Sequence, residues 1–212
     1  MAKASSNKRA VSERWALPAT QARSRATRER LLEAAEIVFA EKGYDGARLS
    51  DIARQAGCSV GAVYFRFKDK SALFSAIAES FTEDARAGLS GLLGGTQNDS
   101  EQLLRAFVTA TAVNFRKHRG LFRAIVERGI EHPQAMQTIF RFRDELAMAL
   151  ENALRKTRDK PAGIPVRVMT QMVYGFLIAG VLNEHAPTRI DDSRAIACLA
   201  DACIAYLGKD AA

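Results

Sequence analysis

The side chains best suited to metal binding or nucleophilic chemistry are three histidines and three cysteines: His118, His132, His185, Cys58, Cys198 and Cys203. Each histidine stands alone, with no cysteine or carboxylate at a metal-ligand spacing from it. The cysteines are too few and too scattered for a disulfide framework, which suits a reducing cytoplasm. No glycine-rich phosphate loop follows a strand. The sequence therefore predicts no metal, no cofactor and no enzyme active site.

A stronger signal lies in the segment 49–67, which reads LSDIARQAGCSVGAVYFRF. The pattern predicts two short helices, near 49–56 and 59–67, joined by a turn at Gly57 and Cys58. Ser59 is placed to cap the second helix. Two helices that cross through a tight turn containing glycine form a helix-turn-helix.

The second of these helices has two distinct faces, because successive residues lie 100° apart. The face expected to pack against the first helix holds Val60, Val63 and Phe67. On the opposite face, Gly61 and Ala62 let the backbone approach another molecule closely. There Phe65 can contact thymine methyl groups and the Tyr64 hydroxyl can reach a phosphate. This face indicates DNA binding; packing of both aromatic residues in the core is the alternative.

The rest of the chain, which must position this face, is also predicted to be helical. Apolar residues at three- and four-residue steps predict helices near 27–43, 49–56, 59–67, 69–91, 100–118, 121–129, 133–157, 165–184 and 191–208. Residues 1–22 lack such a period and are predicted to be a disordered basic tail. The apolar run 166–182 contains Arg167 and Gln171, which favours a buried helix over a membrane span. No apolar leader follows the basic N-terminus.

The fold is therefore expected to be all-α with about nine helices, in one domain over residues 23–70 and a second over 71–212. Thr27–Ala78 resembles the DNA-binding domain of the TetR family of bacterial repressors. The matching positions are Ala34-Ala35, Phe39, Gly43-Tyr44, Asp51-Ile52-Ala53, Ala56-Gly57, Gly61, Tyr64, Phe67 and Lys70. The resemblance implies a three-helix helix-turn-helix domain followed by a helical domain for ligand binding and dimerisation. Residues 79–212 resemble the family only in helix count.

The resemblance also implies a DNA-binding surface, which consists of Arg48, Ser59, Val60, Gly61, Ala62, Tyr64, Phe65, Arg66 and Lys70. Lys70 would contact a phosphate from the start of the fourth helix. Arg48 stands where the family usually has a capping Thr or Ser, so Ser50 is expected to cap the second helix instead. Arg66 stands where His is common. These departures leave the operator sequence open.

The distribution of charge points to an anionic partner for one end of the chain. Residues 1–70 contain fourteen Lys or Arg against eight Asp or Glu, whereas residues 71–212 are nearly neutral. Nucleic acid and an anionic membrane surface both fit such an end, and a solubilising tail is the alternative. Within it, Arg23, Arg25 and Arg28 could meet the DNA backbone or minor groove.

Aromatic, methionine and polar residues recur at helical spacing between 100 and 184. The resemblance implies that these helices enclose a mostly apolar effector pocket with a few polar anchors. Its expected lining is Phe107, Thr111, Asn114, Phe115, Phe122, Met136, Gln137, Phe140, Met169, Met172, Tyr174 and Phe176. A small hydrophobic effector would suit this lining, and ordinary core packing is the alternative.

The last two helices are candidates for a four-helix dimer interface. Two small residues four apart allow close helix approach, and the final helix carries apolar residues at three- and four-residue steps. The expected interface consists of Gly175, Ala179, Ile196, Leu199, Cys203 and Leu207. Burial of both helices inside one subunit is the alternative.

These patterns predict a cytoplasmic, homodimeric transcriptional regulator, with a repressor that binds a palindromic double-stranded DNA operator as the expected form. Recognition helices of such dimers lie about 34–36 Å apart, and an effector would release DNA by binding another state better. Two alternatives remain. One is a small-molecule-sequestering or enzymatic helical domain without specific DNA binding; the other is a regulator that answers to a protein partner.

Overall fold

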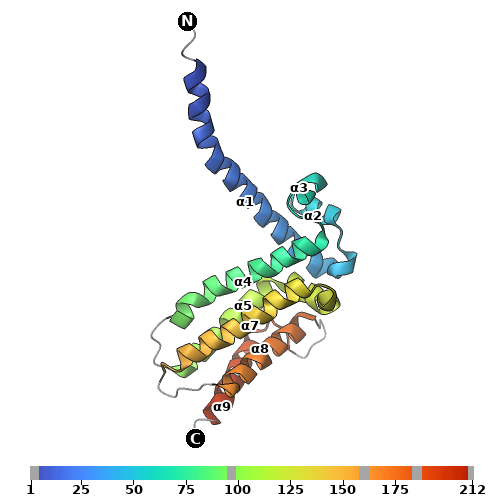
Figure 1. The fold of residues 1–212 in the computed structure, drawn as a ribbon. Helices are drawn as coiled ribbons and strands as arrows, with labels where there is room; N and C mark the ends of the chain where they lie inside the picture. Colours follow the sequence, from blue (N-terminus) through green and yellow to red (C-terminus); the bar gives the residue numbers. More distant parts are fainter. Residues whose placement is uncertain (1–4, 95–98, 158–162, 183–187, 210–212) are drawn as a thin grey trace.

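The computed structural model describes residues 5–94, 99–157, 163–182 and 188–209, and all regular structure in these ranges is helical. The elements are α1 (Ser5–Gly46), α2 (Leu49–Gln55), α3 (Val60–Tyr64), α4 (Lys70–Gly94), α5 (Ser100–Lys117), α6 (Arg119–Arg128), a 3₁₀ turn η1 (Gly129–Glu131), α7 (Pro133–Leu154), α8 (Ile164–Leu182) and α9 (Ser193–Lys209). In Figure 1, α2 and α3 pack beside α1 at one end, α4 to α9 form a bundle, and the N-terminal part of α1 projects away. The predicted all-α fold is confirmed.

The start of α1 differs from the sequence prediction. The helix begins at Ser5, whereas a helix from 27 behind a disordered tail was expected. Residues 5–22 contain four alanines, which favour helix, but they lack the apolar stripe on which the prediction relied. Residues 1–4 of the predicted tail lie outside the described residues. The predicted end is confirmed, because helical geometry breaks at Gly43 with φ 68° and ψ 176°.

The N-terminal domain has a small core made by one face of each of its three helices. Leu31 and Phe39 of α1, Ile52 of α2 and Val63 of α3 are fully buried, and Phe67 follows α3 into the same core. Because α3 has only five residues, burial of this face rather than helix propensity must fix its direction.

The bundle contains an aromatic core between α4, α5 and α6. The rings of Phe115 and Phe122 stack with centroids 3.9 Å apart. Phe81 of α4 meets Phe122 edge-on at 5.0 Å, an arrangement that aromatic quadrupoles favour. This core joins α4, the helix that follows the N-terminal domain, to the rest of the bundle.

Helix α8 is apolar on two sides. Its inner residues Val166, Met169 and Val173 are fully buried, but Val168 and Met172 on the outer side are 41% and 47% exposed. Within the described residues, Ile164–Val181 is long and apolar enough to cross a membrane, and 33% of it is buried in this fold. The expectation of a buried helix therefore holds for one face only.

Candidate nucleic-acid interface

The turn before α3 is fixed by local chemistry that the sequence predicted. Gly57 adopts φ 64°, a left-handed conformation that glycine reaches without strain. The Cys58 N–H donates to the Ala53 carbonyl oxygen over 3.0 Å. The Ser59 hydroxyl then accepts the Ala62 N–H over 3.2 Å, so Ser59 caps α3 as expected.

The start of α2 differs from the expectation that Ser50 would cap it. Arg48 occupies the N-cap position with an extended backbone and makes no side-chain cap. Asp51 acts instead, because its carboxylate accepts a backbone hydrogen bond from Arg48. Asp51 also forms ion pairs with Lys42 (2.8 Å) and Arg54 (2.6 Å). The hydrogen bond from Lys42 is the main reason that the pKa of Asp51 lies below its usual value.

The predicted outer face of α3 and the residue that follows it is open to solvent. Phe65 is 83% exposed and Tyr64 is 57% exposed. Gly61, between the capping Ser59 and these two aromatic residues in the sequence, is also exposed. Ala62 is partly buried. An apolar ring this exposed gains nothing inside the subunit, so its setting suits contact with another molecule.

One assignment on α3 is wrong. Val60 was expected on the inner face with Val63 and Phe67, but it is 39% exposed. As the first residue of α3 it lies at the end of the helix, beyond the reach of the small core. This exposure leaves Val60 on the proposed DNA-binding surface, where the resemblance also placed it.

Arg66 and Lys70 are both tied to the protein backbone. An Arg66 Nη atom donates to the Ala62 carbonyl oxygen over 3.2 Å, and its guanidinium lies 5.6 Å from the Phe65 ring centroid. Lys70 Nζ donates to the carbonyl oxygens of Tyr44 (2.6 Å) and Ala47 (3.1 Å). Burial lowers the pKa of Lys70, and burial also raises the pKa of Tyr44 to about 12. A lysine ammonium has three N–H groups, so Lys70 retains one for the predicted phosphate contact.

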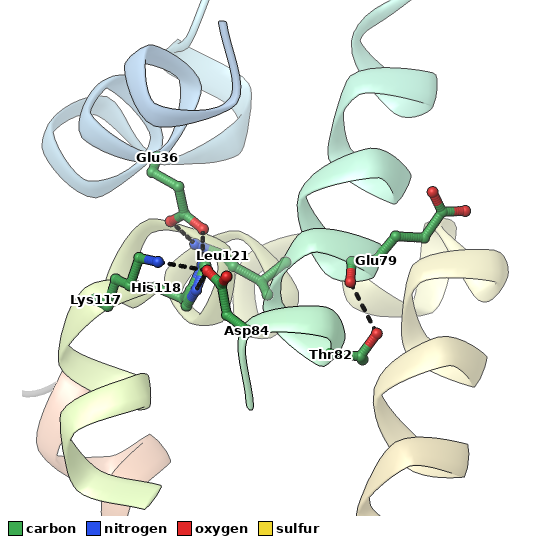
Figure 2. Close-up of polar contacts among 7 residues, drawn as sticks. All are labelled: Glu36, Glu79, Thr82, Asp84, Lys117, His118 and Leu121. Atoms are coloured by element: carbon green, nitrogen blue, oxygen red, sulfur yellow. Dashed lines mark hydrogen bonds and ion pairs between the residues drawn. The ribbon is translucent and has the colours of Figure 1, made fainter. Parts of the chain in front are cut away.

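A buried polar cluster joins the helix-turn-helix domain to the bundle. Figure 2 shows the His118 ring between the carboxylates of Glu36 on α1 and Asp84 on α4. Nδ1 lies 2.9 Å from Glu36, and Nε2 lies 3.2 Å from Asp84. Glu36 also accepts the Leu121 backbone N–H over 2.8 Å, while Lys117 pairs with Asp84. A neutral imidazole can donate to only one of the two carboxylates.

Helix α6 makes further contacts with the end of α1. An Arg123 Nη atom donates to the Ala40 carbonyl oxygen over 2.6 Å, and Glu127 accepts the Tyr44 N–H over 2.7 Å. These bonds satisfy backbone groups that the end of a helix leaves unpaired. Sequence reasoning missed this junction, because its partners are about eighty residues apart and share no local spacing.

Half of the predicted effector-pocket residues fill the core of the bundle. Those that are buried are Phe107, Thr111, Phe115, Phe122, Met169 and Tyr174. The Thr111 hydroxyl donates to the Phe107 carbonyl oxygen over 2.8 Å, and Tyr174 packs edge-on against Phe115 at 5.1 Å. Burial raises the pKa of Tyr174 well above its usual value. These six side chains therefore pack against one another and against their own backbone.

The other six pocket assignments do not enter that core. Asn114, Met136 and Phe176 are partly buried, and Gln137, Phe140 and Met172 are exposed. The assignment of the three exposed residues to a pocket is wrong within this subunit. On α7 the inward face is formed by Ile139, Phe142 and Leu146, so Phe140 lies outside, with Arg143 at 5.2 Å from its ring.

Two cavities on the bundle have other linings. One of about 320 Å³ lies between α7 and α8 and is lined by residues that include Arg143, Arg167 and Gln171. A more apolar one of about 180 Å³ lies between α4 and α7, where the Arg86–Glu145 ion pair (2.8 Å) borders Leu89 and Phe142. None of the predicted pocket residues lines either cavity. The sequence singled out neither of them.

The predicted dimer interface is only partly exposed. Gly175 and Ala179 lie on the outer side of α8, as an interface requires. The four predicted residues of α9 are buried inside the subunit: Ile196, Leu199, Cys203 and Leu207. Their assignment is corrected, because α9 packs its strongest apolar stripe against α5 and α8. The exposed side of α9 instead carries Ala197, Cys198, Asp201, Ala202 and Ala205.

Comparison with known proteins identifies the helix-turn-helix domain. The family model described as bacterial regulatory proteins, tetR family, matches residues 31–77. Residues 31–77 are thus similar to the helix-turn-helix domain of the tetR family. The matched segment covers α1 from residue 31 onward, all of α2 and α3, and the start of α4. Helices α2 and α3 thus match the helix-turn-helix of tetR-family regulatory proteins.

Curated relatives are regulators of the same kind. The chain is 27% identical over 168 residues to the HTH-type transcriptional regulator SrpR of Pseudomonas putida, covering 78% of each protein. It is 47% identical over 58 residues to the HTH-type transcriptional repressor BepR of Brucella suis, covering 27% of this chain and 28% of that protein. At 34% identity it spans about half (47%) of YvdT, an uncharacterised HTH-type transcriptional regulator of Bacillus subtilis.

Solved structures of transcriptional regulators, one of them described as TetR-family, share the fold beyond the matched domain. PfmR from Thermus thermophilus superposes with a TM-score of 0.64 at 22% identity, over 84% of this chain and 97% of that one. A transcriptional regulator from Rhodococcus sp. Rha1 gives a TM-score of 0.68 at 21% identity, over 86% and 94%. At these identities the likeness extends to the fold of α4 to α9 and not to their ligands.

Proposed function

We propose that this TetR-family regulator is a cytoplasmic dimeric repressor that binds a two-fold symmetric DNA operator through α3 and leaves it when a small molecule binds the bundle. The observation that carries the proposal is the open surface of Gly61, Tyr64 and Phe65 on a helix whose other side is fixed in the core. The surface combines close backbone access at Gly61 with an apolar ring for thymine methyl groups and a hydroxyl for phosphate.

The proposal is tested by substitutions on this surface. Phe65→Ala should weaken binding to the selected operator by about 1–3 kcal/mol, as expected for removal of a base contact, with little effect on random DNA. Ile130→Ala is the matched control, because Ile130 is 96% exposed and lies in η1, away from α3. Equal operator affinities for the two variants, measured by fluorescence anisotropy, would refute the assigned surface.

The dimeric part of the proposal rests on the outer sides of α8 and α9. Val168 and Met172 are exposed on α8, and Gly175 and Ala179 continue that side with small residues. Such a face, apolar and with small residues at Gly175 and Ala179, lets a second copy of the chain pack closely. The exposed alanines of α9 extend it.

Oligomeric state tests this face directly. Ala179→Arg adds a charge where the subunit itself makes no core, so it should leave the fold intact and yield a monomer in analytical ultracentrifugation. Val113→Arg is the control, because Val113 is 50% exposed on α5. A dimer that survives Ala179→Arg would place the interface elsewhere.

The effector part of the proposal rests on α4. Lys70 at its start holds the end of α1, and Asp84 further along meets His118. Phe74 lies between them and packs against Phe39 of α1 and His132 before α7, with centroids 6.1 and 5.4 Å away. A ligand that moves α4 would thereby move the helix-turn-helix domain. It can change the equilibrium between the DNA-binding and the released conformation only by the difference in its affinity for the two.

The coupling is measured with a compound found by thermal-shift screening of small apolar molecules. In the wild type such a compound should lower operator affinity by about 5–150-fold, the usual range of allosteric coupling. Phe74→Leu keeps an apolar side chain but loses the ring contacts with Phe39 and His132. The factor by which the compound lowers operator affinity should therefore fall toward one. Unchanged coupling in Phe74→Leu would exclude this route of transmission.

A further inference from the structure

The buried imidazole of His118 lies between carboxylates from two different helices. Its Nδ1 atom is 2.9 Å from a Glu36 oxygen on α1, its Nε2 atom is 3.2 Å from an Asp84 oxygen on α4, and the Phe81 ring packs against it at 5.4 Å (Figure 2). A neutral imidazole has one N–H and one lone pair, so it can donate to only one carboxylate. The protonated ring has an N–H for each of them. This geometry therefore fits the imidazolium.

The balance of charge around the ring also depends on its protonation. The Glu36 side chain is 13% exposed, and its partner among the ion pairs of the described residues is His118. Lys117 of α5 pairs with Asp84, whereas Arg119 at the start of α6 pairs with a carboxylate of the segment before α9. With a neutral His118 the cluster holds two carboxylates and one ammonium. Since a buried carboxylate is costly without a counter-charge, the imidazolium is the form that balances Glu36.

The cluster lies where the helix-turn-helix domain is attached to the bundle. The second Glu36 oxygen accepts the Leu121 backbone N–H of α6 over 2.8 Å. At Gly120 the two helices are so close that a Cβ would lie 2.0 Å from the Glu36 carbonyl oxygen. A change in the bond between His118 and Glu36 therefore acts directly on the position of α1 against α6.

We propose that protonated His118 holds the helix-turn-helix domain against the bundle and that operator binding therefore depends on pH. The inference rests on the proposed function, since it assumes that this domain binds an operator. Histidine ordinarily changes its charge between about pH 5 and 8. As the pH rises through this range, the ring loses one of its two hydrogen bonds to Glu36 and Asp84. A dimer reads two half-sites at a fixed spacing, so domains that are held less firmly lose more freedom on binding and bind the operator less tightly.

The test measures operator binding by the full chain at about pH 5.5 and about pH 8. The quantity compared is the ratio of operator affinity to random-duplex affinity, because general electrostatic attraction contributes to both. In the wild type this ratio should fall about tenfold from the lower to the higher pH, the effect of losing one hydrogen bond to a charged group. An equal ratio at the two pH values would overturn the proposal.

Glu36→Gln is the most informative variant, because it fits the neutral ring. The amide oxygen can accept the Leu121 N–H while the amide nitrogen donates to Nδ1, and the Nε2–H group of the neutral ring donates to Asp84. Its ratio should be similar at the two pH values. His118→Gln, which is uncharged throughout, should also lose the pH dependence. A tenfold change that persists in Glu36→Gln would assign the dependence to other groups and refute the role of His118.

His132→Gln is the matched control. It removes a histidine that contacts Tyr44 of α1 and Ser71 of α4 outside this cluster. The variant should keep the tenfold change of the ratio. Loss of the change in His132→Gln would transfer the pH dependence to His132 and overturn the assignment to His118.

Hydrogen exchange of the Leu121 amide separates this inference from the proposed function. Its protection factor should be greater at about pH 5.5 than at about pH 8 in the wild type, and equal at both in Glu36→Gln. If the wild type binds an operator but neither ratio nor protection depends on pH, the inference fails and the proposed function stands. If the wild type binds no operator at either pH, the proposed function fails, while protection that depends on pH in the wild type alone would still support the contact made by protonated His118.

Discussion

The contact between α1 and α6 leaves no room for a side chain at Gly120, which makes Gly120→Ala a sharp test of how the DNA-binding domain is attached. A Cβ at this position would lie 2.0 Å from the Glu36 carbonyl oxygen and 2.9 Å from a Glu36 carboxylate oxygen. Carbon and oxygen atoms approach to about 3.3 Å at the closest in ordinary packing. The two helices would therefore have to separate by about 1 Å.

That separation has a cost that can be worked from the contacts. Overpacking of this kind costs about 1–3 kcal/mol. It also stretches the bonds from Glu36 to the Leu121 N–H (2.8 Å) and to His118 (2.9 Å), and hydrogen bonds to charged groups contribute about 1.5–3 kcal/mol each. The gain in helix propensity from Gly to Ala returns about 1 kcal/mol. We expect a net loss of about 3 kcal/mol, which lowers the Tm by about 6–12 °C for a chain of this length.

Gly88→Ala is the matched control for this measurement. Gly88 lies inside α4, and a Cβ there would meet nothing within 4 Å. It should raise the Tm by about 2–4 °C through helix propensity alone. Differential scanning calorimetry compares the two variants. A Tm for Gly120→Ala at or above that of the wild type would refute the close packing of α1 on α6.

Three other properties follow from the junction and the core. His118→Ala should lower the free energy of unfolding in urea by about 1–3 kcal/mol, because a buried partner of Glu36 is removed. Lys117→Ala, at an exposed ion pair, should lower it by less than about 1 kcal/mol. Equal effects would contradict the contact of His118 with Glu36 and Asp84. Burial acts to raise the pKa of Asp84, but Lys117 and His118 outweigh it and hold that pKa below its usual value. The resulting stabilisation is present above about pH 4 and is lost as the pH falls through the lowered pKa. In Asp84→Asn the free energy of unfolding should therefore fall less steeply with decreasing pH. An unchanged acid dependence would count against the contacts of Asp84 with Lys117 and His118. Burial raises the pKa of Cys203 to about 11, so Cys203 should resist maleimide at about pH 8 until the protein is unfolded, as peptide mass mapping will report.

The helix-turn-helix could be predicted because each of its signals is local. The glycine turn at Gly57 and the cap at Ser59 lie within four residues of the groups they serve. The 100° period separated the buried Val63 from the exposed Phe65 without any knowledge of the rest of the chain. Two assignments here were wrong: Val60, at the helix end, is exposed, and Ser50 does not cap α2.

The proposed dimer face on α9 could not be predicted by periodicity. The pattern selects the most apolar stripe of a helix, and α9 uses that stripe, with Leu199 and Cys203, in its own core. The exposed side of α9 is made mainly of alanines, with one cysteine and one aspartate, which give almost no periodic signal. A subunit interface and a subunit core follow the same spacing rule, so spacing alone does not separate them.

The two cavities of the bundle and the junction between α1 and α6 were missed for different reasons. Spacing indicated correctly that Phe115 and Phe122 face inward, but whether two rings stack or leave a cavity depends on packing between helices. His118 looked solitary because its partners are 82 and 34 residues away in the sequence. Such contacts are set by the fold and have no local pattern.

The central claim is that α3 reads specific DNA, and selection from a pool of random duplexes by the purified full chain tests it most directly. The account predicts enrichment of a palindrome whose half-sites lie about one helical turn apart, with affinity that falls steeply as salt rises. Selection with Phe65→Ala should lose that enrichment while binding to random DNA persists. The same palindrome enriched by both proteins, or none enriched by the wild type, would contradict the claim.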